Sequence, residues 1–132
     1  MLTYLYIALG GALGSVARYA VSGSVARATQ EVFPWGTLTA NITGCFVIGL
    51  FAVLTGPGGR LVVPPDVRLF VTVGLCGGYT TFSSFSLQTL TLARDGDMTR
   101  AALNVVVSVL FCLLGVWLGS LAGAAFNPVK AG

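Results

Sequence analysis

The chain has 132 residues, of which 55% are hydrophobic and only 8% are charged, and its mean hydropathy is +0.90. This composition predicts an integral membrane protein, not a soluble domain. The net charge is +3, but the basic residues are scattered singly, so nothing indicates nucleic-acid binding. There is no histidine and the four acidic residues fall in predicted loops, which argues against an enzyme or a proton-coupled carrier and favours passive conduction.

The charged residues divide the chain into four apolar segments, and a membrane-spanning helix needs about 20 such residues. We expect helices over residues 2–25, 36–55, 67–93 and 101–125, joined by loops of turn composition. No basic region precedes the first apolar segment, so we interpret it as a retained helix and not as a secretory signal. The prediction is a single all-α domain over residues 1–132, a multi-pass protein of the inner (plasma) membrane.

Glycines recur every four residues on two of the predicted helices: Gly10 and Gly14 on the first, and Gly115, Gly119 and Gly123 on the fourth. Such spacing places a smooth stripe on one helix face, along which another backbone can approach closely. We interpret both stripes as general helix-packing surfaces. The first helix also carries Arg18, the only charge near the interior of a span.

The second helix places Thr37 and Asn41 on one face, four residues apart. An amide in hydrocarbon must find a partner, because an unpaired polar group there costs several kcal/mol. Two interpretations stay open: Asn41 bonds a neighbouring helix, or its NH2 group donates to a passing anion. A second polar stripe on the fourth helix is either an ion track or interhelical hydrogen bonding, and comprises Asn104, Ser108 and Cys112.

The third segment is interrupted at membrane depth by three glycines and a run of hydroxyl residues: Gly74, Gly77, Gly78, Thr80, Thr81, Ser83, Ser84 and Ser86. We expect the glycines to release helical geometry and leave carbonyl groups unpaired, with Thr80 or Thr81 capping a restarted helix. Phe82 and Phe85 then share one helix face. Such pairs are usually core packing, but the electropositive edge of a phenyl ring could line an anion path.

Four spans would place both chain ends and the second loop on one side of the membrane. That side would carry Arg60, Arg68 and Lys130, and the other would carry Arg18, Arg27, Arg94 and Arg100. An excess of Lys and Arg normally sets orientation, so this near balance leaves two alternatives. Either positional effects orient the chain, or it is a dual-topology protein, most simply an antiparallel homodimer.

Three sequence runs together resemble the Fluc (CrcB-type) fluoride channels. They are Gly-x-x-Gly-Gly-x-Thr-Thr-Phe-Ser-x-Phe from Gly74 to Phe85, Asn41-x-x-Gly44-x-Phe46-x-x-Gly49, and Gly10-Gly11-x-x-Gly14-x-x-x-Arg18-Tyr19. The match covers all four segments in order. The resemblance implies an antiparallel, dual-topology homodimer in the lipid bilayer, with two fluoride pores. It also implies that the broken third helices cross at the two-fold axis around a structural sodium ion.

Carried over residue by residue, the resemblance implies that the backbone carbonyls of Gly77 and Thr80 hold the sodium ion. It makes Phe82 and Phe85 the pore phenylalanines and Asn41 a donor to fluoride. The hydroxyl groups of Ser83 and Ser108 would add to the pore lining, whereas the resemblance gives Asn104 and Cys112 no definite role. Arg18 would lie near the aqueous vestibule and draw anions in.

Two other classes remain as alternatives to the fluoride channel. A small multidrug-type exporter also has four helices, but it needs a carboxylate within the membrane, and Glu31 lies outside the predicted spans. A non-transporting assembly subunit would use the polar stripes only for packing. Selectivity for fluoride over chloride rests on the resemblance, because hydrogen-bond donors and phenyl edges could serve either ion.

Overall fold

The computed structural model describes residues 1–127, so Lys130 lies outside the described residues. All the regular structure in that range is helical, which confirms the all-α prediction. In chain order the elements are α1 (Leu2–Thr29), α2 (Trp35–Thr55), α3 (Pro65–Leu69), the π-helix η1 (Phe70–Cys76), α4 (Gly77–Tyr79), α5 (Phe82–Arg94) and α6 (Met98–Phe126).

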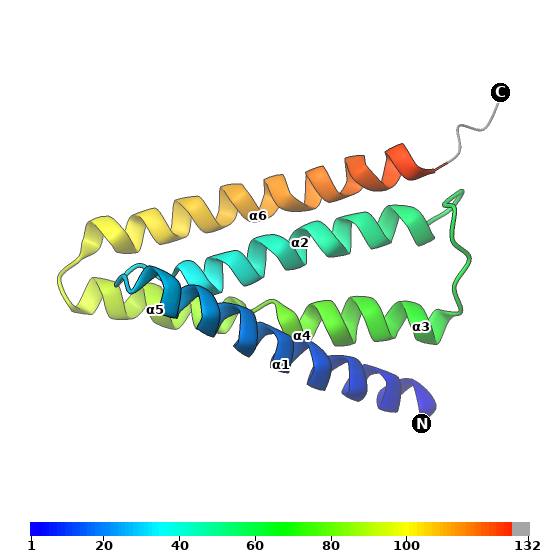
Figure 1. Cartoon of the computed structure of the whole chain (residues 1–132), viewed down its shortest axis with the longest axis horizontal. Helices are drawn as coiled ribbons and strands as arrows, with labels where there is room; N and C mark the ends of the chain where they lie inside the picture. Colours follow the sequence, from blue (N-terminus) through cyan, green and yellow to red (C-terminus); the bar gives the residue numbers. More distant parts are fainter. Residues whose placement is uncertain (128–132) are drawn as a thin grey trace.

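Three helices, α1, α2 and α6, are long and apolar enough to cross a membrane. The predicted third span corresponds to α3, η1, α4 and α5, which follow one another as a single rod interrupted near its middle (Figure 1). The interruption falls between α4 and α5, where Thr80 and Thr81 leave the helical conformation. The four expected segments are therefore present in the expected order.

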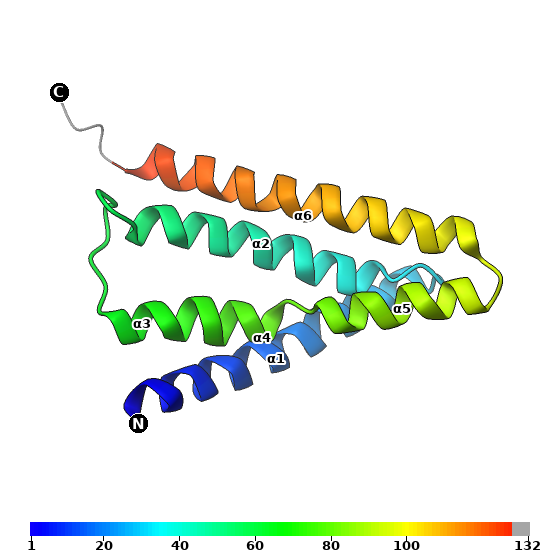
Figure 2. The ribbon, with the colours of Figure 1, turned by 180° about the vertical axis from the view of Figure 1, so that it is seen from behind.

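The helices form two closely packed pairs. The most extensive contact joins α2 to α6, and the next joins α1 to η1, with α1 also packing on α4. Seen from behind, α1 crosses the broken rod obliquely near α4 (Figure 2). The N-terminal end of α1, the C-terminal end of α6 and the loop between α2 and α3 lie at one end of the molecule (Figure 1).

Both pairs are built on the glycine stripes seen in the sequence. A Cβ atom on Gly10 of α1 would lie 2.5 Å from the carbonyl oxygen of Phe70 in η1. A Cβ atom on Gly115 of α6 would lie 3.0 Å from the carbonyl oxygen of Ile42 in α2. The main chains thus approach more closely than any side chain would allow, which confirms the packing interpretation of the stripes.

The three glycines of the third span act differently from the prediction. We expected Gly74, Gly77 and Gly78 to release helical geometry, but Gly74 lies within η1 and the other two lie within α4. A Cβ atom on Gly74 would lie 3.0 Å from the Cα atom of Gly10, and one on Gly78 would lie 2.6 Å from the carbonyl oxygen of Gly11. Gly74 and Gly78 therefore serve close packing against α1, and the chain unwinds only after α4.

Candidate functional site

The break between α4 and α5 consists of two threonines. The backbone N–H and the hydroxyl group of Thr80 both donate to the carbonyl of Cys76, each at 2.9 Å, and this closes the end of α4. Thr81 is extended and its Oγ1 atom accepts the backbone N–H of Ser84 at 3.2 Å, so it caps the restarted helix. The prediction that Thr80 or Thr81 caps a helix beginning at Phe82 is confirmed, with Thr81 in that position.

Asn41 on α2 binds the break through both ends of its side-chain amide. Its Oδ1 atom accepts the backbone N–H of Thr81 at 2.7 Å, and its Nδ2 atom donates to the carbonyl oxygen of Thr81 at 3.0 Å. The side chain is buried, with 8% of the residue exposed. The interhelical interpretation of Asn41 is confirmed. Because an amide nitrogen carries two N–H groups, a second donor remains for the cavity described below.

Arg18 approaches the break from α1. Its Nε atom donates to the carbonyl oxygen of Gly78 at 3.1 Å, and the residue is partly buried. Ser22, one helical turn further along α1, lines the wide cavity described below. The guanidinium group thus contacts α4, immediately before the chain unwinds.

The break leaves the carbonyl groups at the end of α4 without their helical partners, and those of Gly77 and Thr80 are among them. In a continuous helix, the N–H of Thr81 would donate to the Gly77 carbonyl and the N–H of Ser84 to the Thr80 carbonyl. Here the Thr81 N–H donates to Asn41 and the Ser84 N–H donates to the Thr81 side chain. Backbone carbonyl oxygens are ligands for alkali-metal ions. The Gly77 and Thr80 carbonyls therefore fit the cation site that the resemblance implies.

A narrow cavity of about 230 Å³ lies beside the break. It is lined by Asn41 from α2, Phe82 and Phe85 from α5, and Ser108, Val109, Cys112 and Leu113 from α6. The two phenyl rings lie with their centroids 5.2 Å apart and their planes inclined at 51°. Phe85 is buried at 9% exposure, whereas Phe82 is 77% exposed. The cavity thus combines aromatic walls with an amide and a hydroxyl group, and none of its lining side chains is charged.

The polar stripe on α6 joins that helix to α5. Asn104 is 2% exposed, and its Nδ2 atom donates to Oγ1 of Thr89 at 2.9 Å. Its Oδ1 atom accepts the hydroxyl group of Ser108 at 3.3 Å. Asn104 therefore makes interhelical hydrogen bonds, while Ser108 and Cys112 line the narrow cavity.

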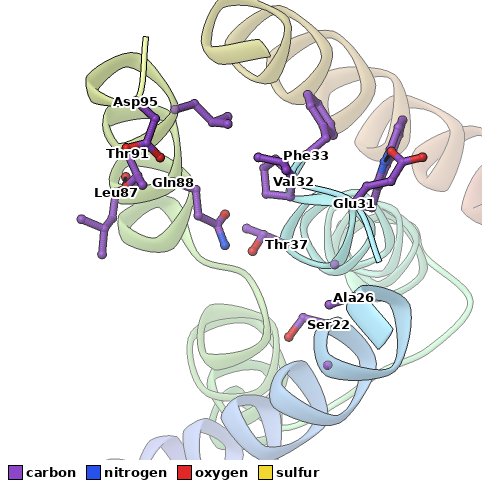
Figure 3. Close-up of a pocket in the computed structure, with 15 residues that line it drawn as sticks. Ser22, Ala26, Glu31, Val32, Phe33, Thr37, Leu87, Gln88, Thr91 and Asp95 are labelled. Atoms are coloured by element: carbon purple, nitrogen blue, oxygen red, sulfur yellow. Dashed lines mark hydrogen bonds between the residues drawn. The ribbon is translucent and has the colours of Figure 1, made fainter. Parts of the chain in front are cut away.

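A wider cavity of about 510 Å³ lies between α1, α2 and α5, near the loops that precede α2 and follow α5 (Figure 3). Its polar lining includes Ser22, Thr37, Gln88 and Thr91, together with the loop carboxylates Glu31 and Asp95. The amide of Gln88 points toward the part of α2 that carries Thr37 (Figure 3). Thr37 precedes Asn41 by one turn, and Gln88 follows Phe85 by about one turn. The wide and narrow cavities therefore follow one another along the same two helices.

Comparison with known proteins places the chain in a family. The model of the family described as CrcB-like protein, Camphor Resistance (CrcB), matches residues 5–120. The chain belongs to the CrcB family. It is 61% identical over 126 residues to a protein of Rhodospirillum rubrum, covering 96% of this chain and 98% of the relative. It is 59% identical over 130 residues to a protein of Opitutus terrae, covering 98% of each. Both relatives are named fluoride-specific ion channel FluC.

In this CrcB-family chain, the structure brings together four of the residues predicted to line a pore: Asn41, Phe82, Phe85 and Ser108. Ser83 lies outside the narrow cavity lining, and its hydroxyl group lies 3.3 Å from Oγ1 of Thr81.

Sequence reasoning missed Gln88, which lines the wide cavity. Its Oε1 atom is buried and has no hydrogen-bond partner among residues 1–127. The sequence could have pointed to Gln88, because it follows Phe85 by three residues and so lies near Phe85 on the same helix face.

Proposed function

We propose that this chain is a passive fluoride channel. The observation that carries the proposal is the narrow cavity beside the break, which is walled by Phe82 and Phe85 and contains the Asn41 amide and the Ser108 hydroxyl group. The names of the relatives from Rhodospirillum rubrum and Opitutus terrae support fluoride as the ion. The family match over residues 5–120 supports the same assignment.

The narrow cavity suits a small, strongly hydrated anion better than the wide cavity, which the carboxylates Glu31 and Asp95 also line. An ion in the wide cavity would keep most of its water, beside polar side chains such as Thr37 and Gln88. In the narrow cavity, the second N–H of Asn41, the hydroxyl group of Ser108 and the edges of the phenyl rings would replace water. No charged side chain lines that cavity, so no fixed opposite charge would hold the ion there.

The proposal includes an antiparallel homodimer with two pores and a structural sodium ion on its axis. The Gly77 and Thr80 carbonyls, which lose their helical partners at the break, would contribute to that site from each subunit. A bound sodium ion would supply a fixed positive charge near the pores. Phe82 is 77% exposed in a single chain, so it is accessible to a second copy in such a dimer.

The positions of the carboxylates favour a channel over a proton-coupled exporter. Glu31 lies in the loop before α2, is exposed, and accepts the indole N–H of Trp35 at 2.6 Å. Asp66, near the start of α3, accepts the hydroxyl group of Thr3 at 2.8 Å. No carboxylate lines the narrow cavity within the described residues. Glu31 and Asp95 line the wide cavity from its loops, so the carboxylate that proton exchange would need is missing only from the narrow cavity.

Fluoride efflux from liposomes, followed with a fluoride electrode, tests the proposal. The wild type should give fast passive efflux, whereas Phe82→Ile and Asn41→Asp should abolish it with the dimer intact. Phe111→Ile is a matched control, because Phe111 lies on α6, is half exposed and does not line the narrow cavity. Cation exchange driven by a pH gradient would indicate the exporter, and the absence of any transport would indicate the assembly subunit.

A further inference from the structure

We propose that Asn41 and Arg18 are positioning residues that brace the break in the third span from two sides. They fix the unwound backbone so that the Gly77 and Thr80 carbonyls keep the direction that a cation site requires. The link to the cation rests on the proposed function, whereas the brace itself is a property of this chain. It adds a role for Asn41 and Arg18 beyond donation to an anion or attraction of anions.

A break at membrane depth exposes peptide groups that water cannot reach. Each such N–H or carbonyl must find a partner within the protein, because lipid offers none. Thr81 illustrates the problem, since it is extended and its neighbours cannot close a helical turn around it. The side chains that satisfy its peptide groups therefore determine where the unwound segment lies.

Asn41 satisfies both backbone groups of Thr81 at once. The two hydrogen bonds, at 2.7 and 3.0 Å, run in opposite directions between one amide side chain and one backbone residue. A carboxylate could accept the N–H but would turn a negative charge toward the Thr81 carbonyl. Asn41 is also 8% exposed, so water does not compete for either bond. The reciprocal pair fixes the position and the orientation of this residue of the break.

Arg18 holds the opposite side of the break. Its Nε atom donates to the Gly78 carbonyl at 3.1 Å, three residues before the residue that Asn41 binds. A hydrogen bond with a charged donor is stronger than one between neutral groups. The chain is therefore tied on both sides of the point where it unwinds, to α1 through Gly78 within α4 and to α2 through Thr81 in the break.

Each of the two bracing helices carries a glycine about one turn from its polar residue. On α1, Gly14 precedes Arg18, and a Cβ atom there would lie 2.8 Å from the backbone nitrogen of Tyr79. On α2, Gly44 follows Asn41, and a Cβ atom there would lie 3.0 Å from Cδ1 of Tyr79. The two glycines allow the helices to approach the break closely enough for the polar side chains to reach it.

The brace also distinguishes two kinds among four carbonyls at the break, those of Gly77, Gly78, Thr80 and Thr81. Those of Gly78 and Thr81 are occupied by the bracing side chains. Those of Gly77 and Thr80 lose their helical donors and remain for a cation. Without the brace, the unwound segment would be free to rotate. The Gly77 and Thr80 carbonyls would then no longer point in a fixed direction.

Hydrogen exchange of the Thr81 backbone amide, measured by mass spectrometry on the full chain in nanodiscs, tests the brace directly. We expect exchange about tenfold faster in Asn41→Ala, because the acceptor of that N–H is removed. Asn104→Ala is the matched control, since it removes another buried asparagine that does not contact the break. Exchange at Thr81 should be unchanged in Asn104→Ala.

Asn41→Ser provides a milder variant if Asn41→Ala does not fold. Equal exchange at Thr81 in the wild type and both Asn41 variants would overturn the brace.

A second measurement tests whether the brace supports the cation site. The quantity measured is the sodium concentration that gives half of the maximal thermal stabilisation of the protein. We expect Asn41→Ala and Arg18→Met to raise it about tenfold, Arg18→Lys to restore it by keeping a charged donor, and Asn104→Ala to leave it unchanged. An unchanged midpoint in Asn41→Ala and Arg18→Met would overturn the link to the cation and leave Asn41 as a donor to the anion. A wild type without any sodium-dependent stabilisation would overturn the proposed cation site, while the exchange of Thr81 would still decide the brace.

Discussion

Replacing Gly10 by alanine tests the main-chain contact between α1 and η1. The new Cβ atom would lie 2.5 Å from the Phe70 carbonyl oxygen and 2.9 Å from the Leu75 nitrogen. A carbon atom and a carbonyl oxygen normally approach to about 3.3–3.6 Å, so α1 would have to move away by roughly 1 Å. Overpacking of this kind costs about 1–3 kcal/mol, and both partners here are backbone groups that cannot change rotamer.

Gly11→Ala is the matched control, because a Cβ atom on Gly11 would meet nothing within 4 Å. Both variants gain the higher helix propensity of alanine, worth about 0.8–1.0 kcal/mol in a helix interior. The difference between them therefore isolates the packing cost, and we expect Gly10→Ala to be less stable than Gly11→Ala by about 1–3 kcal/mol. Unfolding free energies measured by steric trapping in bicelles give this difference. Equal stability of the two variants would refute the close approach of α1 and η1.

Three further predictions concern other parts of the molecule. Thr81→Ala should remove the cap of α5 at a cost of about 1 kcal/mol, and exchange of the Ser84 amide should increase, whereas Thr81→Ser should retain the protection. Asn104→Leu should destabilise the chain by about 1–3 kcal/mol, because the buried Ser108 hydroxyl group loses its acceptor and the hydrogen bond to Thr89 on α5 is lost; a denaturation midpoint equal to that of the wild type would contradict the assignment. Asp97 accepts the backbone N–H of Arg100 and also its guanidinium group, which together lower the pKa of the Asp97 carboxyl. Protection of the Arg100 amide, corrected for intrinsic exchange, should be full at neutral pH and should decline as the pH falls through that lowered pKa. Asp97→Ala should show no such decline.

The number and order of the helices follow from features that the sequence displays openly. Charges and turn residues mark the ends of the apolar segments, and lipid requires any such segment to satisfy its own backbone as a helix. The cap at Thr80 or Thr81 was also predictable, because threonine side chains are favoured at the residue that precedes a helix. These inferences depend on local chemistry, which the chain carries in consecutive residues.

The role of the glycines in the third span could not be predicted in the same way. Glycine permits unusual backbone angles and also close approach of another helix. Only the contacts of Gly74 and Gly78 with α1 show that packing is their purpose. The same limit applied to Asn41. An amide in a membrane span needs a hydrogen-bond partner, but the sequence does not show that this partner is the backbone of Thr81.

Both ends of the described chain lie at the same end of the molecule (Figure 1). For four membrane crossings, this has a practical consequence for topology mapping. Reporters fused before α1 and after α6 must always give the same answer for any one molecule, even if the population contains both orientations. A population inserted both ways would divide each reporter between the two sides in the same proportion. Disagreement between the two reporters would therefore identify a span that failed to insert.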